Sequence, residues 1–258
     1  MYSSGSTGYP KGVAVQHSSL LNFLYSMQQQ PGINKDDNLL AVTTISFDIA
    51  ALEIYLPLIT GATLVLASRE IAINADLLSR KIAEKNISIM QATPATWRML
   101  LDNNWQGKQD FKILCGGEAV PQSLATELAS CCQEIWNLYC PTESTILSSV
   151  YKFTKDNYSI VPIGKAIANT QFYILDSQSN LVSPGIPGEL YIGGAGLARG
   201  YLNRPDLTAE RFIPNPFSLN NEHLLCVAVS FRTLNRSSSA PSAPSAFSVP
   251  LRLCDFAR

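Results

Sequence analysis

Apolar residues follow two different spacings along residues 12–138, and the two spacings alternate. Short continuous apolar runs predict strands, whereas apolar residues that recur every three or four positions predict helices. Strands are expected at residues 12–16, 38–47, 62–67, 87–92, 111–115 and 134–138, and helices at 18–27, 49–59, 74–86, 94–102 and 121–132. We expect the strand at 62–67 to be buried. Alternation of this kind predicts an α/β fold, with a mostly parallel sheet and helices on both faces.

The pattern changes after about residue 150. Residues 170–194 place apolar side chains at every second position, interrupted by D-S-Q-S-N and P-G turns, which predicts a small antiparallel β unit. Residues 235–250 form a Ser/Ala/Pro tract that cannot bury enough apolar surface to order itself. We therefore predict an incomplete α/β subdomain at 1–150, an incomplete β-rich subdomain at 151–217, and a disordered or foreign tail at 218–258.

Composition restricts the partners that the protein can have. The 258 residues are 46% hydrophobic and 15% charged, with a net charge of −1, which is typical of a globular and lightly charged protein. The sequence has no basic stripe, so we expect no nucleic-acid or anionic-membrane partner. No apolar run approaches the ~20 residues of a membrane helix. The N-terminus also has no signal-peptide pattern.

Cysteine and histidine placement excludes several kinds of site. The two histidines, His17 and His223, lie in no triad or zinc-protease motif. The cysteines have no metal-binding spacing, so we expect free thiols in a reducing cytoplasm. The six cysteines are Cys115, Cys131, Cys132, Cys140, Cys226 and Cys254.

The segment "YSSGSTGYPKG" (2–12) is the first candidate for chemistry. Small residues let backbone N–H groups turn toward a phosphate, and Lys11 adds a positive charge. The segment is not a Walker A sequence, because Lys11 is followed by glycine, and its composition also fits a linker or turn. Loops of this kind normally follow a strand. No strand precedes this one, so the start of the chain looks cut.

Four further blocks give the loop its context. They are "FDIAALEIYLPL" (47–58), "GGEAVP" (116–121), "NLYCPTES" (137–144) and "GELYIGGAGLARGYLNRPDLTAERF" (188–212). Together with the loop, these blocks resemble, in order and spacing, the adenylation (AMP-binding) domains of nonribosomal peptide synthetases, which belong to the adenylate-forming superfamily. The resemblance covers residues 2–217 and implies a partial N-terminal lobe of that fold.

The resemblance implies an activity, cofactors and partners. An amino-acid carboxylate attacks the α-phosphate of ATP in the presence of Mg²⁺, which gives an aminoacyl adenylate and pyrophosphate. The acyl group then passes to the phosphopantetheine thiol of a peptidyl carrier domain, and a condensation domain is a further partner in the parent enzyme. Charge accumulates on phosphate oxygens, so such a site needs cations and oriented N–H donors.

The resemblance also implies roles for individual residues. The catalytic residues are Lys11, Thr142 and Glu143; Thr142 would bond the α-phosphate, and Glu143 would ligate Mg²⁺. Tyr139 would stack on adenine and Asn137 would bond its edge. The nucleotide-binding set is Ser4, Gly5, Ser6, Thr7, Gly8, Gly116, Gly117, Glu118, Asn137 and Tyr139.

Cys140 departs from the family, which nearly always has glycine there. If that position requires a positive φ, the side chain costs about 1 kcal/mol or more. This departure puts the local nucleotide geometry in question.

The same motifs locate a substrate pocket. Its residues are Asp48, Ile49, Leu52, Gln91, Leu114, Gly116, Leu138, Ile146 and Leu147. Asp48 would pair with the substrate ammonium group, which favours amino acids over fatty acids. Most other positions are medium or large, so the pocket leaves little room for a substrate side chain. The set resembles the glycine-activating pattern except at Leu147, where that pattern usually has tryptophan. We expect glycine as the substrate, with alanine second.

The end of the sequence lacks two expected features. A Tyr-Arg-Thr-Gly-Asp motif, which would grip the ribose, does not follow Phe217, and "FRTLN" (231–235) is only faintly similar to it. The lid lysine is also missing, so we expect no ATP–pyrophosphate exchange from the isolated chain. Three alternatives remain: a piece of a glycine-activating domain, a non-catalytic remnant that binds nucleotide weakly, or an acyl-CoA ligase-like enzyme, which Asp48 disfavours.

Overall fold

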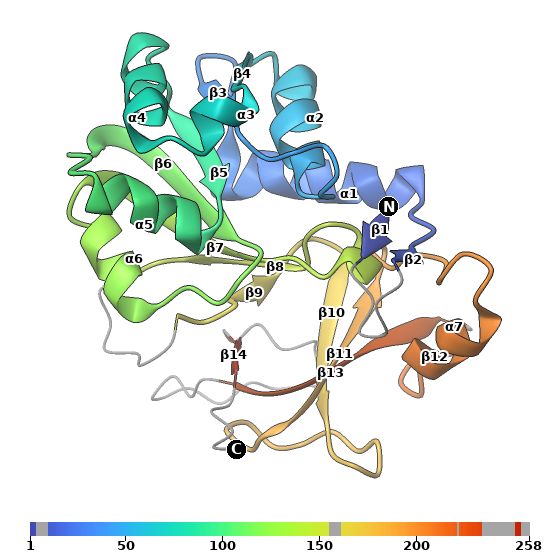
Figure 1. Cartoon of the computed structure of the whole chain (residues 1–258). Helices are drawn as coiled ribbons and strands as arrows, with labels where there is room; N and C mark the ends of the chain where they lie inside the picture. Colours follow the sequence, from blue (N-terminus) through green and yellow to red (C-terminus); the bar gives the residue numbers. More distant parts are fainter. Residues whose placement is uncertain (4–9, 155–160, 221, 234–250, 254–258) are drawn as a thin grey trace. The chain divides into compact units, whose positions relative to one another are not determined.

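The computed structural model describes residues 1–3, 10–154, 161–220, 222–233 and 251–253 (Figure 1). Contacts divide the chain into two compact units. The first unit is Met1–Phe23, Cys140–Ser149 and Pro162–Arg258, and the second unit is Leu24–Tyr139 and Val150–Val161. These limits differ from the predicted ones at residues 150 and 217, because the first unit is assembled from three separate stretches of chain.

The second unit contains most of the larger sheet. Its strands are β3 (Asn38–Ala41), β4 (Thr63–Leu66), β5 (Ile89–Ala92), β6 (Lys108–Gly116), β7 (Cys132–Tyr139) and β8 (Ser149–Lys152). The seven-stranded order is β4-β3-β5-β6-β7-β8-β9, with β9 at Lys165–Ala166. The pairs from β4 to β7 are all parallel, which confirms the predicted mostly parallel sheet.

The helices between these strands begin and end where local chemistry places them. They are α2 (Ala50–Thr60), α3 (Arg69–Ala72), α4 (Ala75–Glu84), α5 (Pro94–Asp102) and α6 (Gln122–Leu128). Helix α1 (His17–Met27) precedes them and continues into a π-helical turn, η1 (Gln28–Gly32). The side chains of Asn74 and Thr93 accept N–H bonds at the starts of α4 and α5. Gly61, at φ +76°, ends α2 in the left-handed region that glycine tolerates best.

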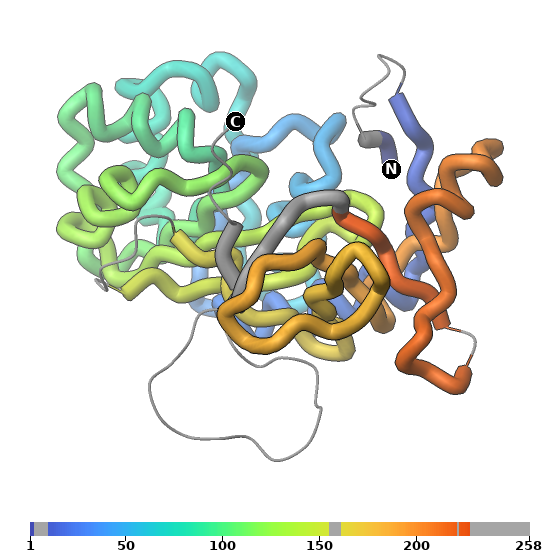
Figure 2. The backbone as a smooth tube through the Cα atoms, turned by 90° about the horizontal axis from the view of Figure 1, so that it is seen from below, coloured from blue at the N-terminus to red at the C-terminus, as the bar shows by residue number. Residues whose placement is uncertain are grey.

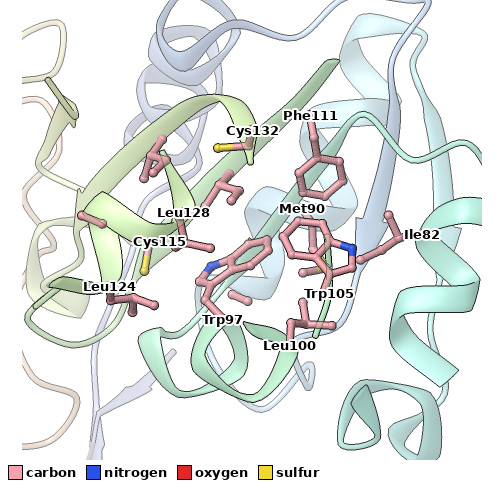
Figure 3. Close-up of a cluster of buried hydrophobic side chains, with 14 of the residues drawn as sticks. Ile82, Met90, Trp97, Leu100, Trp105, Phe111, Cys115, Leu124, Leu128 and Cys132 are labelled. Carbon is pink, nitrogen blue, oxygen red and sulfur yellow. The ribbon is translucent and has the colours of Figure 1, made fainter. Parts of the chain in front are cut away.

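One face of the sheet carries the main hydrophobic core (Figure 3). Successive strand residues point to opposite faces, so Met90, Ile113 and Cys115 face the same side. Helices α4, α5 and α6 cover this side, as Figure 1 also shows. Trp97 is fully buried there, with its ring 6.1 Å from Trp105 and 6.2 Å from Phe111. This packing fixes one face, and the alternate residues of the same strands point to the other face.

The first unit contains the smaller sheet. Its strands are β10 (Thr170–Leu175), β11 (Gly188–Gly194), β12 (Phe212–Pro214), β13 (His223–Thr233) and β14 (Leu251–Leu253), and helix α7 is Pro205–Arg211. The order is β10-β11-β13-β12, with β14 beside β13. All of these pairs are antiparallel, which confirms the predicted antiparallel β unit.

The N-terminal segment of the first unit runs beside residues 199–202. Strand β1 (Tyr2–Ser3) pairs with β2 (Lys11–Gly12), and Val13 then forms an antiparallel bridge with Tyr201. The N–H of Leu202 donates to the Gly12 carbonyl at 2.7 Å, and the N–H of Ala14 donates to Gly200 at 2.9 Å. Both views show the two segments side by side (Figure 2). This pairing fixes where the Lys11 side chain begins.

Four predicted elements differ in the structure. The strand expected at 12–16 is shorter and earlier, because only Lys11–Gly12 has a strand partner and Val13 makes a single bridge. The strand expected at 38–47 ends at Ala41, because a turn with the Phe47 N–H bonded to Thr44 begins the next connection. The strand at 62–67 is not buried: β4 lies at the sheet edge, and Leu66 is 67% exposed. The helix expected at 121–132 ends at Leu128, because Cys132 already belongs to β7.

Part of the predicted tail at 218–258 belongs to a strand of the smaller sheet. Residues 223–233 form β13, which pairs with β11 and β12, and the side chains of Leu224 and Leu225 are buried. The apolar residues of β13 form part of the small sheet. The composition of the Ser/Ala/Pro tract at 235–250 does not extend to this strand. Residues 234–250 and 254–258 lie outside the described part of the chain.

The described residues were also searched for membrane-spanning helices and for disulfides. None of the helices there has the length and apolar character needed to cross a bilayer. No disulfide joins any of the five cysteines in the described part of the chain.

Candidate nucleotide and amino-acid site

The first unit brings Lys11 and Glu143 to one pocket. Glu143 lies in the short 3-10 helix η2 (Thr142–Ser144), and its carbonyl accepts the N–H of Ala198 at 2.9 Å. The chain then reaches Tyr201, whose hydroxyl donates to Glu143 Oε1 at 2.7 Å. Lys11 Nζ lies 5.4 Å from the centre of the Tyr201 ring. Tyr201 therefore contacts both of the residues predicted to act on phosphate and metal.

These side chains line a pocket of about 230 Å³. Its lining consists of Lys11, Pro141, Glu143, Tyr201, Arg211, Leu225, Cys226 and Val227. Pockets for whole drug-sized ligands are typically about 300–1,000 Å³, so this one suits a polyphosphate group better than a whole nucleotide. Two cations and one carboxylate face a volume that an anion could enter.

Tyr201 remains a hydrogen-bond donor throughout the physiological pH range. Burial raises the pKa of its hydroxyl most, and the bond to Glu143 and the negative charge of Glu143 raise it further. A protonated phenol can only donate to a carboxylate, so it holds one oxygen of Glu143 in place. The N–H of Tyr201 in turn donates to Thr208 Oγ1 at 2.9 Å, which anchors the residue to α7.

The donor set of the first unit fits magnesium held mainly by its substrate. No cluster of three or more His, Cys, Asp or Glu side chains able to hold a metal occurs in the described part of the chain. Mg²⁺ commonly binds through one or two carboxylates together with substrate phosphates and water. Glu143 Oε2 accepts no hydrogen bond from any described residue. One carboxylate oxygen is thus available beside the two cationic side chains.

Backbone strain follows directly after η2. Thr145 and Ile146 have φ of +62° and +71°, which is unusual for a non-glycine residue and most unusual for the β-branched Ile146. Both side chains are fully buried, and Thr145 Oγ1 has no hydrogen-bond partner among the described residues. Strain of this kind costs about 1–3 kcal/mol per residue and occurs most often at functional sites.

The structure also answers the question raised at Cys140. Seven described residues other than glycine have a positive φ, and Cys140 is not one of them. The backbone therefore accepts the cysteine without the predicted strain. Ser4, Gly5, Ser6, Thr7 and Gly8 lie outside the described residues.

The second unit groups the substrate residues at the carboxyl ends of parallel strands. Gln91 on β5 pairs in register with Leu114 on β6, and Gly116 on β6 pairs with Leu138 on β7. Register partners point to the same face, so all four lie opposite the Trp97 core. The carboxyl ends of strands are the usual ligand edge of an open α/β sheet.

The remaining substrate residues of this unit lie at the start of α2. Ile49 and Leu52 are buried, and Asp48 precedes the helix in the turn that follows β3. Gln91, Leu114 and Leu138 are at most 2% exposed. Two predicted pocket residues, Ile146 and Leu147, belong to the first unit and are fully buried.

The nucleotide residues of the second unit lie on the same strands. Asn137 and Tyr139 are on β7 and flank Leu138, so their side chains have the opposite orientation. Gly116 ends β6, and Gly117, at φ +86°, directly follows it. Gly117 and Glu118 are exposed.

A buried acid next to the substrate residues was missed in the sequence. Glu53 on α2 is fully buried and accepts the Thr43 hydroxyl at 2.6 Å and the Thr43 N–H at 3.0 Å. The Thr43 hydroxyl also lies 3.0 Å from Gln91 Oε1. Burial raises the pKa of Glu53 to about 7, against the lowering effect of its hydrogen bonds from Thr43 and from the Val42 backbone.

The sequence analysis did not name four residues of these sites, and they differ in how far the sequence indicates them. Tyr201 and Arg211 stand inside the block at 188–212, so a closer examination of that block could have found them. Glu53 stands inside the block at 47–58. Thr43 has no local signal, because only the fold brings it to the acid.

Glu53 predicts a pH dependence of stability. Its pKa in the folded state, about 7, exceeds the ordinary value of 4.5, so unfolding releases its proton between these values. Stability should therefore fall as pH rises from 4.5 to 7, by about 3 kcal/mol from this group alone. The Glu53→Gln variant can still form hydrogen bonds with Thr43 but does not titrate. Its stability should therefore lack the decrease with pH that Glu53 causes. Urea unfolding at several pH values measures the difference, and a difference that stays constant with pH contradicts the assignment.

Comparison with known proteins gives the family. The model of the AMP-binding enzyme family matches residues 1–202. A dimodular nonribosomal peptide synthase of Bacillus subtilis (strain 168) is 49% identical over 217 residues, which are 84% of this chain and 9% of that protein. A PKS-NRPS hybrid synthetase of Aspergillus candidus is 46% identical over 218 residues, again 84% and 9% of the two chains. The chain thus spans about a tenth of the length of these relatives.

Solved structures agree with this assignment. A four-domain nonribosomal peptide synthetase, crystallised with AMP and glycine, is 41% identical with a TM-score of 0.84, over 90% of this chain and 17% of that one. The Vibrio cholerae adenylation domain AlmE, in complex with glycyl-adenosine-5′-phosphate, matches in fold with a TM-score of 0.83 at 24% identity, over 91% of this chain and 45% of that one. The chain belongs to the AMP-binding enzyme family, as an adenylation domain of the nonribosomal peptide synthetase type.

Proposed function

We propose that this chain is the nucleotide- and amino-acid-binding part of a ligase that uses ATP to activate an amino acid, most favourably glycine. The observation that carries the proposal is the meeting of Lys11 and Glu143 in one pocket, with Tyr201 bonded to the acid. The relative that is 41% identical was crystallised with AMP and glycine, which supports both ligands. The acyl-CoA ligase alternative gains no support from a described residue.

Each residue of the first unit has a separate task in this proposal. Lys11 balances negative charge on the β- and γ-phosphates, and Thr142 donates to the α-phosphate. Glu143 offers one carboxylate oxygen to Mg²⁺, which neutralises phosphate charge when bound. Tyr201 keeps that carboxylate from rotating. Arg211 adds a second cation at the wall of the pocket.

The reaction needs positioning more than acid–base catalysis. A carboxylate oxygen of the amino acid attacks the α-phosphorus of ATP, and the bond to the bridging oxygen breaks, so pyrophosphate leaves with the electron pair. In the second step, a phosphopantetheine thiolate attacks the acyl carbon and AMP leaves. A peptidyl carrier domain supplies that thiol, and a condensation domain uses the resulting thioester.

The second unit supplies recognition in this proposal. Asn137 and Tyr139 hold the adenine, and Asp48 pairs with the substrate ammonium group. Glycine is favoured because Ile49, Leu52 and Gln91 are buried and medium-sized or large, so walls built from them would leave little room for a substrate side chain. Alanine ranks second. Cysteines without metal-binding spacing, and without a disulfide among the described residues, favour a reducing, cytoplasmic location.

The 258-residue chain itself should bind these ligands without turnover. Its residues 218–258 contain no Tyr-Arg-Thr-Gly-Asp sequence to grip the ribose hydroxyls. Binding, rather than ATP–pyrophosphate exchange, is therefore the appropriate assay for this chain.

Removing the Lys11 charge should weaken ATP binding. A hydrogen bond to a charged group contributes about 1.5–3 kcal/mol, so Lys11→Ala should raise the Kd for ATP in magnesium buffer by about tenfold or more. Isothermal titration calorimetry measures the change. Lys35→Ala is the matched control, because that side chain is 78% exposed and lies in the second unit. Equal affinities for the two variants would contradict the role of Lys11.

Glycine is tested with non-hydrolysable aminoacyl adenylates. Sulfamoyl adenosines carrying glycine, alanine or leucine differ only in the side chain. The glycyl compound should bind at least about tenfold more tightly than the leucyl one, because one extra methylene in a closed pocket already changes affinity about tenfold. Equal binding of the leucyl compound would overturn glycine while leaving the nucleotide site intact.

A further inference from the structure

Gln91 is held in the second unit by one polar contact. Its side chain is 1% exposed, and its Oε1 lies 3.0 Å from the Thr43 hydroxyl. The amide nitrogen donates to no described residue. The hydroxyl of Thr43 is thus the only polar restraint on the orientation of this side chain in the described structure.

The Thr43 hydroxyl carries a single proton but lies between two acceptors. Its oxygen is 2.6 Å from Glu53 Oε1 and 3.0 Å from Gln91 Oε1. If Glu53 is ionised, the proton goes to the carboxylate and Gln91 loses its donor. If Glu53 is protonated, its O–H donates to Thr43, and Thr43 donates to Gln91. Only the second arrangement places a hydrogen in both of these oxygen–oxygen contacts.

Burial favours the protonated arrangement. Glu53 has no exposed surface, and a buried carboxyl without a cationic partner takes up a proton rather than remain charged. Among the described residues, no ion pair involves Glu53. The Thr43 N–H bond to Glu53 Oε2 persists in either state and keeps the acid beside the threonine.

We propose that Glu53, Thr43 and Gln91 form a hydrogen-bonded clamp that fixes the Gln91 side chain as a rigid wall of the amino-acid pocket and so enforces selection of glycine over alanine. Glu53 and Thr43 are positioning residues, because they act through Gln91. The inference rests on the proposed function insofar as Gln91 lines that pocket. A side chain without its clamp rotates and yields to a substrate methyl group.

The test uses variants of Thr43 in the full chain. Thr43→Val keeps the size of the side chain and its N–H bond to Glu53 but removes the hydroxyl. Thr43→Ser keeps the hydroxyl. Thr60→Val is the matched control, because among the described residues its hydroxyl bonds only to the Leu56 and Pro57 carbonyls of α2. Glu53→Gln can still donate to Thr43 through its amide.

The first readout is the pair of side-chain amide signals of Gln91 in NMR spectra. Two sharp and separated signals are expected for the wild type, Thr43→Ser, Thr60→Val and Glu53→Gln. Thr43→Val should shift them toward the positions of an unrestrained glutamine amide or broaden them by conformational exchange. Unchanged Gln91 signals in Thr43→Val overturn the clamp, whether or not any ligand binds.

The second readout is the ratio of affinities for the glycyl and alanyl sulfamoyl adenosines. We expect Thr43→Val to lower this preference by about three- to tenfold, and the other three variants to retain it. A retained preference in Thr43→Val overturns the role in selection. If the wild type binds neither compound, the proposed function fails, and the Gln91 signals still decide the clamp.

Discussion

The hydrogen bond from Tyr201 to Glu143 depends on a short stretch of backbone pairing. Residues 12–14 and 200–202 lie antiparallel through bonds such as that from the Leu202 N–H to Gly12. This pairing places Lys11 near the ring of Tyr201, while the Ala198 N–H holds the Glu143 carbonyl. A cation and an acid that are 132 positions apart in the chain therefore share one pocket. If this pairing were lost, the charge of Lys11 and the carboxylate of Glu143 would have no common ligand.

In the second unit, the two faces of the larger sheet have different roles. Its sheet buries one face under α4, α5 and α6, and leaves the alternate residues of β5, β6 and β7 for recognition. An acid at zero exposure, Glu53, is tolerated there because Thr43 forms a hydrogen bond with each of its two carboxyl oxygens. A buried acid of this kind is costly to stability. Residues that lower stability in this way are expected mainly at functional sites, where binding rather than packing requires them.

Much of this architecture could be predicted from the sequence, and the reason is local. Helix α5 begins and ends at the predicted residues because Thr93 caps it and Pro94 suits its first turn. Helix α2 ends within one residue of its predicted end, because Gly61 adopts the left-handed conformation directly after it. The edge position of β4 could not be predicted, because an apolar run does not reveal how many neighbours a strand has. Strand β13 was missed because its partner β11 is distant in sequence and the tract after it is poor in apolar residues.

Some residues of the candidate site could be predicted from the sequence, and others could not. The motifs named Lys11, Glu143 and Gln91 because each lies in or is counted from a recognisable block. Thr43 acts through contacts that only the fold creates, so its role was not predicted. Tyr201 lies inside the block at 188–212, but its bond to Glu143 is visible only in the structure. The expected strain at Cys140 was absent, and strain was found instead at Thr145 and Ile146.

The central claim is that Lys11 and Glu143 act on one triphosphate–magnesium complex, and a double-mutant cycle tests it most directly. The affinity for ATP with Mg²⁺ is measured for the wild type, Lys11→Ala, Glu143→Gln and the double variant. Glutamine keeps an acceptor for Tyr201 but loses the charge that binds the metal. Residues that share a ligand should show a coupling free energy of about 1 kcal/mol or more. Losses that add to within about 0.5 kcal/mol would show that the two residues act independently, and would contradict the account.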